Sequence, residues 1–234
     1  MEKIDHRHHF GIMLDTETAN TIVEEDNKLD MRYVLPYDIG FAVIDTKGNI
    51  YETHSYVNSD IFIKEFKLMQ SAYYVDKIPQ YIVDLANGTR KLANTYEIRQ
   101  ILLKVIAEYG CEFIVAHNSR FDLTACNNIQ RWTTKSKYRY FFPYDIEIWD
   151  TLKMAREVFK NNKEYREFCE TNGYMTKHKT PQVQFTAEVL YRFLTNNTDF
   201  IEEHTGLEDV LIEVEIFKYC MSKRPKHKKL FEEN

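Results

Sequence analysis

The sequence predicts an α/β fold: a mixed five-stranded sheet, with three antiparallel strands followed by parallel β-α units and with helices on both faces. Two observations carry this prediction. The first 57 residues hold three short apolar segments separated by polar loops, which is typical of antiparallel strands. From residue 112 onward, short apolar runs alternate with stretches of helical periodicity, which is typical of β-α units.

The three N-terminal strands are expected at Phe10–Leu14, Tyr37–Asp45 and Ile50–Val57. Between the last two lies the sequence DTKGN, Asp45–Asn49, whose residue types favour a hairpin turn. The second and third strands should therefore be antiparallel neighbours. The polar segment Asn20–Asp30 is expected to be a loop between the first two strands.

A mainly helical segment is expected at residues 59–109. Its clearest helix stops at Gly110 and places six apolar side chains on one face: Ile98, Ile101, Leu102, Val105, Ile106 and Tyr109. The fourth strand follows at Glu112–Ala116, and a helix is expected to begin near Phe121.

The fifth strand is expected at Ile146–Trp149, followed by a helix from about Thr151. The last helix should run from about Leu207 to Met221 and be closed by Pro225, with a basic tail at 222–234. Its apolar face consists of Leu207, Val210, Leu211, Val214 and Phe217. Neither a linker nor a repeat interrupts the sequence, so residues 1–234 are expected to form a single domain.

The composition is that of a globular protein, with 44% hydrophobic and 29% charged residues. No apolar run approaches the roughly 20 residues that span a bilayer, and no apolar signal follows Met1, so a cytoplasmic protein without a membrane partner is expected. The four cysteines are scattered without a Cys-x-x-Cys pair, which supports neither a zinc ribbon nor a disulfide framework. The formal charge of −5 does not by itself indicate a nucleic-acid-binding protein.

The first group of candidate site residues is Asp15-Thr-Glu-Thr18, directly after the first strand. If the strand continues through Glu17, the carboxylates of Asp15 and Glu17 point to one face, because side chains alternate along a strand. Carboxylate oxygens are hard ligands that suit Mg²⁺ or Mn²⁺. Taken alone, an Asp-x-Glu pair is more often a solvated strand end.

The second group is Asp122, at the end of the fourth strand and the start of a helix, an edge at which ligands gather in α/β sheets. An Asp favoured by the helix dipole would also explain this position. The third group is His204 and Asp209, placed just before and within the first turn of the last helix. A histidine with a pKa near neutrality can take a proton from water, although a lone surface histidine is commoner.

Together the three segments resemble the three motifs of the DEDD exonuclease superfamily: Asp-x-Glu, then Asn-x-x-Phe-Asp, then His-x-x-x-x-Asp. The resemblance covers nearly the whole chain and extends to Ile148–Lys153, which is similar to the family's fifth strand and following helix. Position 205 is Thr, where the DEDDy branch has a catalytic Tyr, so the chain resembles the DEDDh branch of RNase T and proofreading subunits. It looks most like the small independent enzymes of bacteria and their viruses.

This resemblance implies an RNase H-like fold and a two-metal mechanism. Asp15, Glu17, Asp122 and Asp209 would hold two divalent cations, Mg²⁺ or Mn²⁺, with Asp15 bridging them. His204 would act as general base, and all five would be catalytic residues. The neighbouring positions expected to contact the substrate or support the site are Thr16, Thr18, Asn118 and Phe121.

The implied reaction is 3′→5′ removal of nucleoside 5′-monophosphates from single-stranded or frayed DNA 3′ ends. The resemblance does not identify a polymerase or replication partner. Two alternatives stay open: a 3′→5′ exoribonuclease that trims RNA, and a catalytically silent nucleic-acid-binding adaptor. The presence of all four carboxylates and the histidine argues against the catalytically silent adaptor. Two departures from the pattern are Asn20 and Gly206, where many relatives have Gly and Ala. Gly206 is expected to weaken the last helix and loosen the segment that carries His204.

Three other features have less specific interpretations. The N-terminal His6, His8 and His9 are expected to be a polar lead into the first strand rather than a metal site. The basic stretch Lys223–Lys229 could hold phosphates or be a solvated tail. Aromatic residues within the helical segment could stack on bases, but at helical spacing core packing is favoured: Phe62, Phe66, Tyr73, Tyr74 and Tyr81.

Overall fold

The computed structural model describes residues 4–19 and 30–223. Its six-stranded sheet has the order β4-β3-β2-β1-β5-β6. The strands are β1 (Phe10–Ala19), β2 (Leu35–Asp45), β3 (Ile50–Asn58), β4 (Lys91–Ala93), β5 (Phe113–Ala116) and β6 (Glu147–Asp150). Strands β1, β2 and β3 pair antiparallel, whereas β5 and β6 continue from β1 in parallel.

The predicted mixed α/β sheet is therefore confirmed, with one strand more than expected. The additional strand, β4, lies within the segment 59–109 and pairs in parallel with β3. It has only three residues, and two of them are exposed, so its sequence shows neither an apolar run nor an alternating pattern. The strand β1 also extends five residues beyond the predicted end at Leu14, through Glu17 to Ala19.

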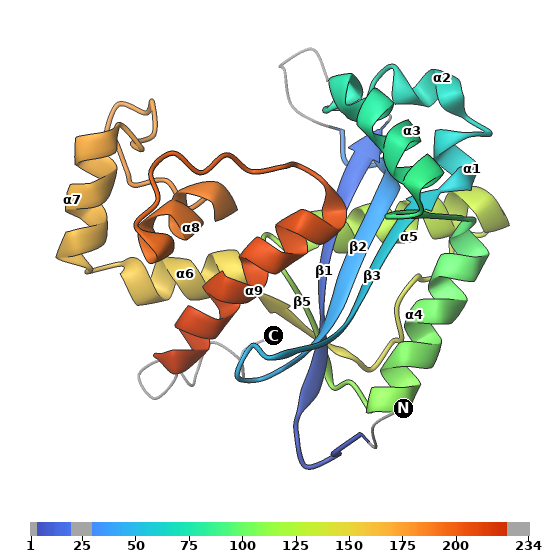
Figure 1. Cartoon of the computed structure of the whole chain (residues 1–234), viewed down its shortest axis with the longest axis horizontal. Coiled ribbons are helices and arrows are strands. Elements are labelled where there is room, and N and C mark those ends of the chain that lie inside the picture. The colour runs from blue at the N-terminus through green and yellow to red at the C-terminus, as the bar shows by residue number, and fades with distance from the viewer. Residues whose placement is uncertain (1–3, 20–29, 224–234) are drawn as a thin grey trace.

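The helices connect these strands and cover the sheet on both faces (Figure 1). In chain order they are α1 (Ser59–Phe62), α2 (Phe66–Met69), the 3₁₀ turn η1 (Val75–Lys77), α3 (Ile78–Asn87), α4 (Thr95–Tyr109), α5 (Arg120–Thr134), α6 (Thr151–Phe159), α7 (Lys163–Asn172), α8 (Ala187–Thr195) and α9 (Gly206–Ser222). The helices α4, α5, α6 and α9 lie close to the positions that the sequence predicted.

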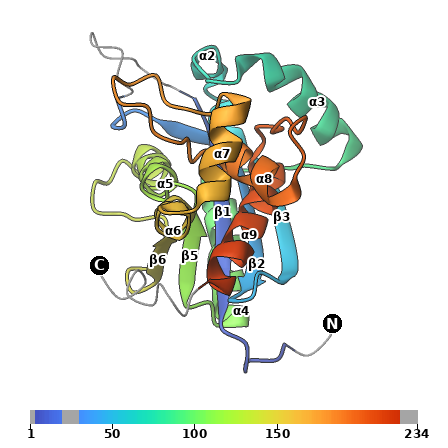
Figure 2. The same cartoon turned by 90° about the vertical axis from the view of Figure 1, so that its left-hand side faces the viewer.

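The core consists of two apolar layers, one on each face of the sheet, because the side chains of each strand alternate between the faces. In β1, Ile12 and Leu14 join the layer beneath α4 and α5, while Met13 joins the layer beneath α6, α8 and α9. Figure 2 shows α5 on one side of β1 and β5 and α9 on the other. Three residues separate the carboxyl end of β5 from the start of α5, and α9 packs on β1 and β2. None of the described helices is long and apolar enough to cross a membrane.

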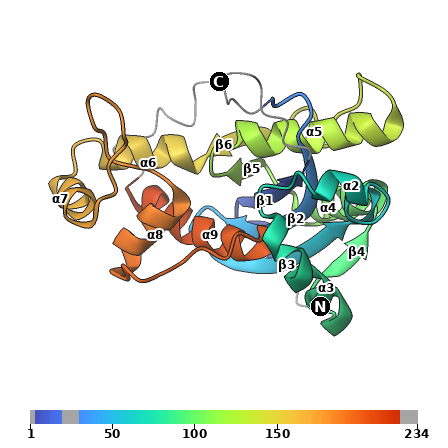
Figure 3. The same cartoon turned by 90° about the horizontal axis from the view of Figure 1, so that it is seen from above.

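The segment from α1 to β4 lies at one end of the molecule, and α7 and α8 lie at the other (Figure 3). Of its aromatic residues, Phe62 and Tyr81 are buried in the core, which confirms core packing for these two. Phe66 and Tyr73 are exposed. Tyr74 is half-buried and contacts the candidate site described below.

The N-terminal histidines do not form a metal site with one another. His9 pairs with Glu112, with 2.9 Å between Nδ1 and a carboxylate oxygen, and His8 lies 3.5 Å from Asp45. Among the described residues, the only group with metal-binding geometry is a different one, in the pocket described below. Asn20 and all but the first residue of the basic stretch at 223–229 lie outside the described residues.

Candidate active site

Strand β1 carries the first two carboxylates toward α9. Asp15 pairs with Gly40 and Glu17 with Asp38 across the antiparallel ladder, so both side chains leave the same face of the sheet. Thr16, between them, points to the opposite face, where its Oγ1 donates a hydrogen bond of 2.8 Å to Asp122 Oδ1. The continuous strand through Glu17 is the geometry that the Asp-x-Glu spacing predicted.

Asp122 reaches the site from the first turn of α5. It is 3% exposed, and the Thr16 hydroxyl fixes its carboxylate beside β1. The connection from β5 to α5 turns sharply at Asn118, whose φ of 69° is left-handed. Asp150 stabilises this turn, because its Oδ1 accepts from the backbone N of Asn118 at 3.3 Å and from Leu152 N at 2.9 Å. One carboxylate thus caps α6 and holds the loop that leads to Asp122.

Helix α9 contributes Asp209 from its first turn. The helix begins beside β2, where the backbone N–H of Gly206 donates to Asp38 Oδ2 at 2.9 Å. His204, two residues before the helix, has a left-handed φ of 50° and turns its ring toward Glu17 and Asp209. One potential metal-ligating atom from each of Glu17, His204 and Asp209 lies within 4.8 Å of the other two, so the three side chains are close enough to share one metal ion.

Gly206 is needed for this close approach. A Cβ built on Gly206 would lie 2.7 Å from the backbone N of Gly40, and a Cβ built on Gly40 would meet the backbone of Gly206. The start of α9 is therefore packed directly on β2, and Gly206 does not loosen the segment as its helix propensity suggested. Because neither glycine has a side chain, the two backbones pack directly against each other, and this packing holds the segment in place.

This packing reverses the expected sign of a substitution. Helix propensity alone predicts that Gly206→Ala stabilises the protein by up to about 1 kcal/mol. We expect destabilisation by about 1–3 kcal/mol instead, because the added methyl group overlaps backbone atoms that cannot move aside. Thermal unfolding of Gly206→Ala and Gly40→Ala measures the effect. A melting temperature above that of the wild type for both variants would contradict the close packing.

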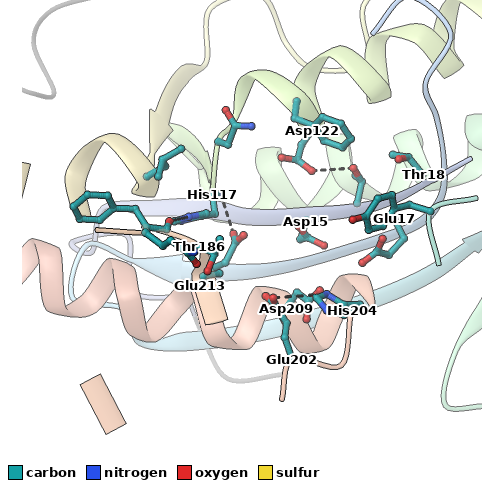
Figure 4. A pocket seen from close by; sticks show the side chains of 18 of the residues that line it. Asp15, Glu17, Thr18, His117, Asp122, Thr186, Glu202, His204, Asp209 and Glu213 are labelled. Atoms are coloured by element: carbon teal, nitrogen blue, oxygen red, sulfur yellow. Dashed lines mark hydrogen bonds and ion pairs between the residues drawn. The ribbon is translucent and has the colours of Figure 1, made fainter. Parts of the chain in front are cut away.

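All nine residues singled out from the sequence line one pocket of about 810 Å³ (Figure 4). They are Asp15, Thr16, Glu17, Thr18, Asn118, Phe121, Asp122, His204 and Asp209. Asn118 and Phe121 form part of its wall, whereas the Thr16 hydroxyl is already bonded to Asp122. Toward α6 the pocket continues along Leu152, Arg156 and Phe185, and Tyr73 and Tyr74 border it on another side.

The structure adds two carboxylates and a histidine to the pocket that the sequence did not single out. Glu213 is 3% exposed, and its Oε2 accepts a hydrogen bond of 3.1 Å from the backbone N of His117. Its position, four residues after Asp209, is the available sequence signal: the two lie on one helix face, which is otherwise apolar. Glu202 and His117 also line the pocket, but they come from loops without a recognisable pattern.

Burial is the main influence on the pKa values of the acidic residues in the pocket. Burial and, after it, the neighbouring carboxylates raise the pKa of Glu17 to about 9 and that of Asp209 to about 8. Burial likewise raises the pKa of Asp122 to about 7, partly offset by the Thr16 hydrogen bond. The pKa values of Asp15 and Glu213 are also raised well above their ordinary range, first by burial and then by Asp122.

These carboxylates cannot all be ionised without a compensating positive charge. In addition, Oδ1 of Asp209 is buried without a hydrogen-bond partner. A divalent cation would supply that positive charge and a partner for Asp209, and a set of carboxylate oxygens suits Mg²⁺ or Mn²⁺. The residues present therefore fit a divalent metal centre.

A pH dependence of stability follows from the raised pKa values. Between the ordinary carboxyl pKa, about 4, and the raised values of 7 to 9, the folded metal-free protein binds more protons than the unfolded chain. Its stability should therefore fall as the pH rises through this range. We expect the melting temperature in EDTA to decrease from pH 6 to pH 9 and Mg²⁺ or Mn²⁺ to restore it most strongly at pH 9. Glu17→Gln combined with Asp209→Asn should flatten this dependence; an unchanged slope would contradict the assignment.

No protein-family model matches the sequence, and no curated protein matches it. Solved structures of E. coli exonuclease I share the fold. One in complex with a dT13 oligonucleotide aligns with a TM-score of 0.56 over 94% of this chain and 43% of that chain, at 14% identity. Another, with a 5cy-dA13 oligonucleotide, aligns with a TM-score of 0.54 over 96% of this chain and 42% of that chain, at 15% identity.

This chain thus spans less than half the length of the exonuclease I chains. The shared architecture agrees with the RNase H-like α/β fold that the sequence motifs implied.

Proposed function

We propose that this chain is a divalent-metal-dependent 3′→5′ exonuclease. One observation supports this most strongly: carboxylates from β1, α5 and α9 converge with His204 in one pocket. Their raised pKa values indicate a site that is stable in its ionised form only with a cation. The likeness of the fold to E. coli exonuclease I supports the same conclusion.

The metal centre would be formed by Asp15, Glu17, Asp122 and Asp209, which would hold two divalent cations, Mg²⁺ or Mn²⁺. Two bound cations stabilise the negative charge that develops on the attacking and leaving oxygens of an in-line phosphoryl displacement. Thr16 keeps the Asp122 carboxylate in place through its hydroxyl group.

His204 would accept the proton of the attacking water. Burial lowers the pKa of its imidazole, so the ring is neutral and can accept a proton at neutral pH. The water oxygen bonds to the phosphorus of the terminal phosphodiester as the bond to the 3′ oxygen of the preceding nucleotide breaks. The products are a nucleoside 5′-monophosphate and a strand shortened by one nucleotide with a free 3′ hydroxyl group.

The proposed substrate is the 3′ end of single-stranded or frayed DNA. The pocket has the size of a small-molecule site, and Phe121 and Phe185 offer it aromatic surface on which a base could stack. Exonuclease I was solved with single-stranded DNA oligonucleotides bound, and the alignment covers nearly all of this chain. The oligonucleotides bound to exonuclease I favour DNA over RNA as the first substrate to test.

The direction of cleavage gives a direct test. With a single strand labelled at its 5′ end, and with Mg²⁺ or Mn²⁺ present, we expect a descending ladder and release of mononucleotides. A blocked 3′ terminus should protect the strand, because the attacked phosphodiester must be the terminal one. Sizing the products on a denaturing gel checks both points.

Two controls distinguish the alternatives. A circular single strand has no 3′ end, so cleavage at a comparable rate would identify an endonuclease and contradict the proposal. A matched RNA strand should be degraded more slowly than DNA. Preference for RNA would identify an exoribonuclease, and binding without any cleavage would identify an adaptor.

A further inference from the structure

The ring of His204 is stacked on a residue far away in the sequence. Tyr74 lies against it with 4.3 Å between ring centroids and 12° between ring planes. Tyr74 belongs to the segment between α2 and η1, within the stretch from α1 to β4. Its neighbour Tyr73 packs edge-on against it at 4.8 Å. The candidate general base is thus supported from one side by a segment that carries none of the motif residues.

The backbone of His204 is held by contacts other than the one with Tyr74. Its φ of 50° is left-handed, a conformation that costs a non-glycine residue free energy and persists only where surrounding contacts fix it. On the C-terminal side, the hydroxyl group of Thr205 donates to Glu208 at 2.6 Å, and Gly206 N donates to Asp38 at 2.9 Å. These bonds fix the backbone after His204, whereas the contact with Tyr74 acts on the imidazole itself.

The segment that carries Tyr74 is firmly attached to the same region. Arg90, which follows α3 and is 5% exposed, pairs with Asp84 of α3 at 3.0 Å, with Asp38 of β2 at 3.1 Å and with Glu208 of α9 at 2.7 Å. Tyr81 of α3 also donates to Asp38 at 2.7 Å. Helix α3, the strand opposite Glu17 and the first turn of α9 therefore share one network around the buried Arg90, which ties the helix that follows Tyr74 to the helix that follows His204.

From this geometry we infer that Tyr74 is a positioning residue, which holds the imidazole of His204 in the orientation needed to take the proton from the attacking water. The inference rests on the proposed exonuclease function. The stacked phenol ring restricts the rotation of the imidazole and keeps it directed at Glu17 and Asp209. Tyr74 acts through His204 and requires no contact with the substrate.

The kinetic test uses Tyr74→Ala, Tyr74→Phe and a control, Tyr144→Ala, in the full chain. Tyr144 is 98% exposed and outside the pocket. On a single-stranded DNA substrate at saturating metal, Tyr74→Ala should lower kcat about 10- to 100-fold with little change in KM, because a small misplacement of a catalytic group costs up to about 10²-fold. Tyr74→Phe keeps the ring and should restore kcat, and Tyr144→Ala should behave as wild type.

A double-mutant cycle distinguishes positioning from contact with a nucleobase. If Tyr74 acts through His204, adding Tyr74→Ala to His204→Ala should change kcat by less than about twofold, because the two losses are not additive. A base-stacking role would instead raise KM and would do so in both backgrounds. That result, or wild-type kcat in Tyr74→Ala, would overturn the inference.

A spectroscopic measurement separates this inference from the exonuclease proposal. The ring current of Tyr74 should shift the imidazole Cε1 proton of His204 upfield in the metal-free protein, and the signal is assigned by its loss in His204→Gln. Tyr74→Phe should keep the shift and Tyr74→Ala should remove it. If the wild type shows the shift but no nuclease activity, the proposed function fails. If it is active but Tyr74→Ala leaves both shift and kcat unchanged, the positioning role fails.

Discussion

Replacing Asp15 or Asp122 by Asn is expected to lower kcat by about 10³-fold or more without unfolding the protein. Bound cations contribute several kcal/mol of transition-state stabilisation, and each 1.4 kcal/mol corresponds to a factor of ten in rate. The fold should survive, because burial already raises the pKa of both carboxyls and a neutral amide removes the cost of a buried charge. In Asp122→Asn, the amide oxygen can still accept the hydrogen bond from Thr16.

The measurements are single-strand degradation at several Mg²⁺ and Mn²⁺ concentrations and thermal unfolding of each variant in EDTA. Glu215→Gln is a suitable control, since Glu215 is an exposed acid on α9 outside the pocket. It should keep wild-type activity. Near wild-type turnover by both Asp15→Asn and Asp122→Asn in excess metal would rule out the proposed metal centre.

His204 carries the second large expected effect. His204→Ala should lower kcat by roughly 10²–10⁴-fold, the usual contribution of general acid–base catalysis. In the wild type, the rate should rise with pH through the imidazole pKa, because only the neutral ring accepts a proton. Burial lowers this pKa, so the rise should lie below the ordinary value of 6.5. The acid limb should disappear in His204→Gln. His204→Tyr should restore part of the rate lost in His204→Ala only if its hydroxyl group reaches the same water.

The arrangement also suggests a different role for His204 that the same variants test. Its ring nitrogen lies within 4.8 Å of carboxylate oxygens of Glu17 and Asp209, so the imidazole could itself be a metal ligand. Mn²⁺ affinity measured by calorimetry separates the two roles. A general base leaves the affinity of His204→Gln close to that of the wild type. A large loss of affinity would assign His204 to the metal, and a loss of less than tenfold in kcat would place the base elsewhere.

Much of the fold follows from local sequence patterns. Strands β1, β2, β3, β5 and β6 and helices α4, α5, α6 and α9 appear where alternation, apolar runs and helical periodicity predicted them. Strand β4 was missed because its three residues carry no pattern; it forms only because β3 offers free backbone groups to pair with. Local propensity determines long elements, whereas the pairing of a short strand depends on its neighbour.

In the candidate site, too, local spacing predicted the relations within each element, and the tertiary structure decided the contacts between elements. Spacing alone placed Asp15 and Glu17 on one face of a strand and put Asp122 and Asp209 in first turns of helices, because backbone geometry fixes these relations within each element. Only the tertiary structure brought the three segments to one pocket and added Glu213, whose burial depends on how α9 packs on β1 and β2.

Contacts between distant segments decided the remaining features. The sequence assigned Gly206 a weakening effect on α9, whereas the structure packs it against Gly40 of β2. Tyr74 was one aromatic residue among five in a helical segment until folding placed it on the ring of His204. Both contacts join residues far apart in the chain, and their geometry depends on the packing of whole elements. A sequence pattern reports the conformation of its own element, whereas the free energy of such contacts depends on where the other elements lie.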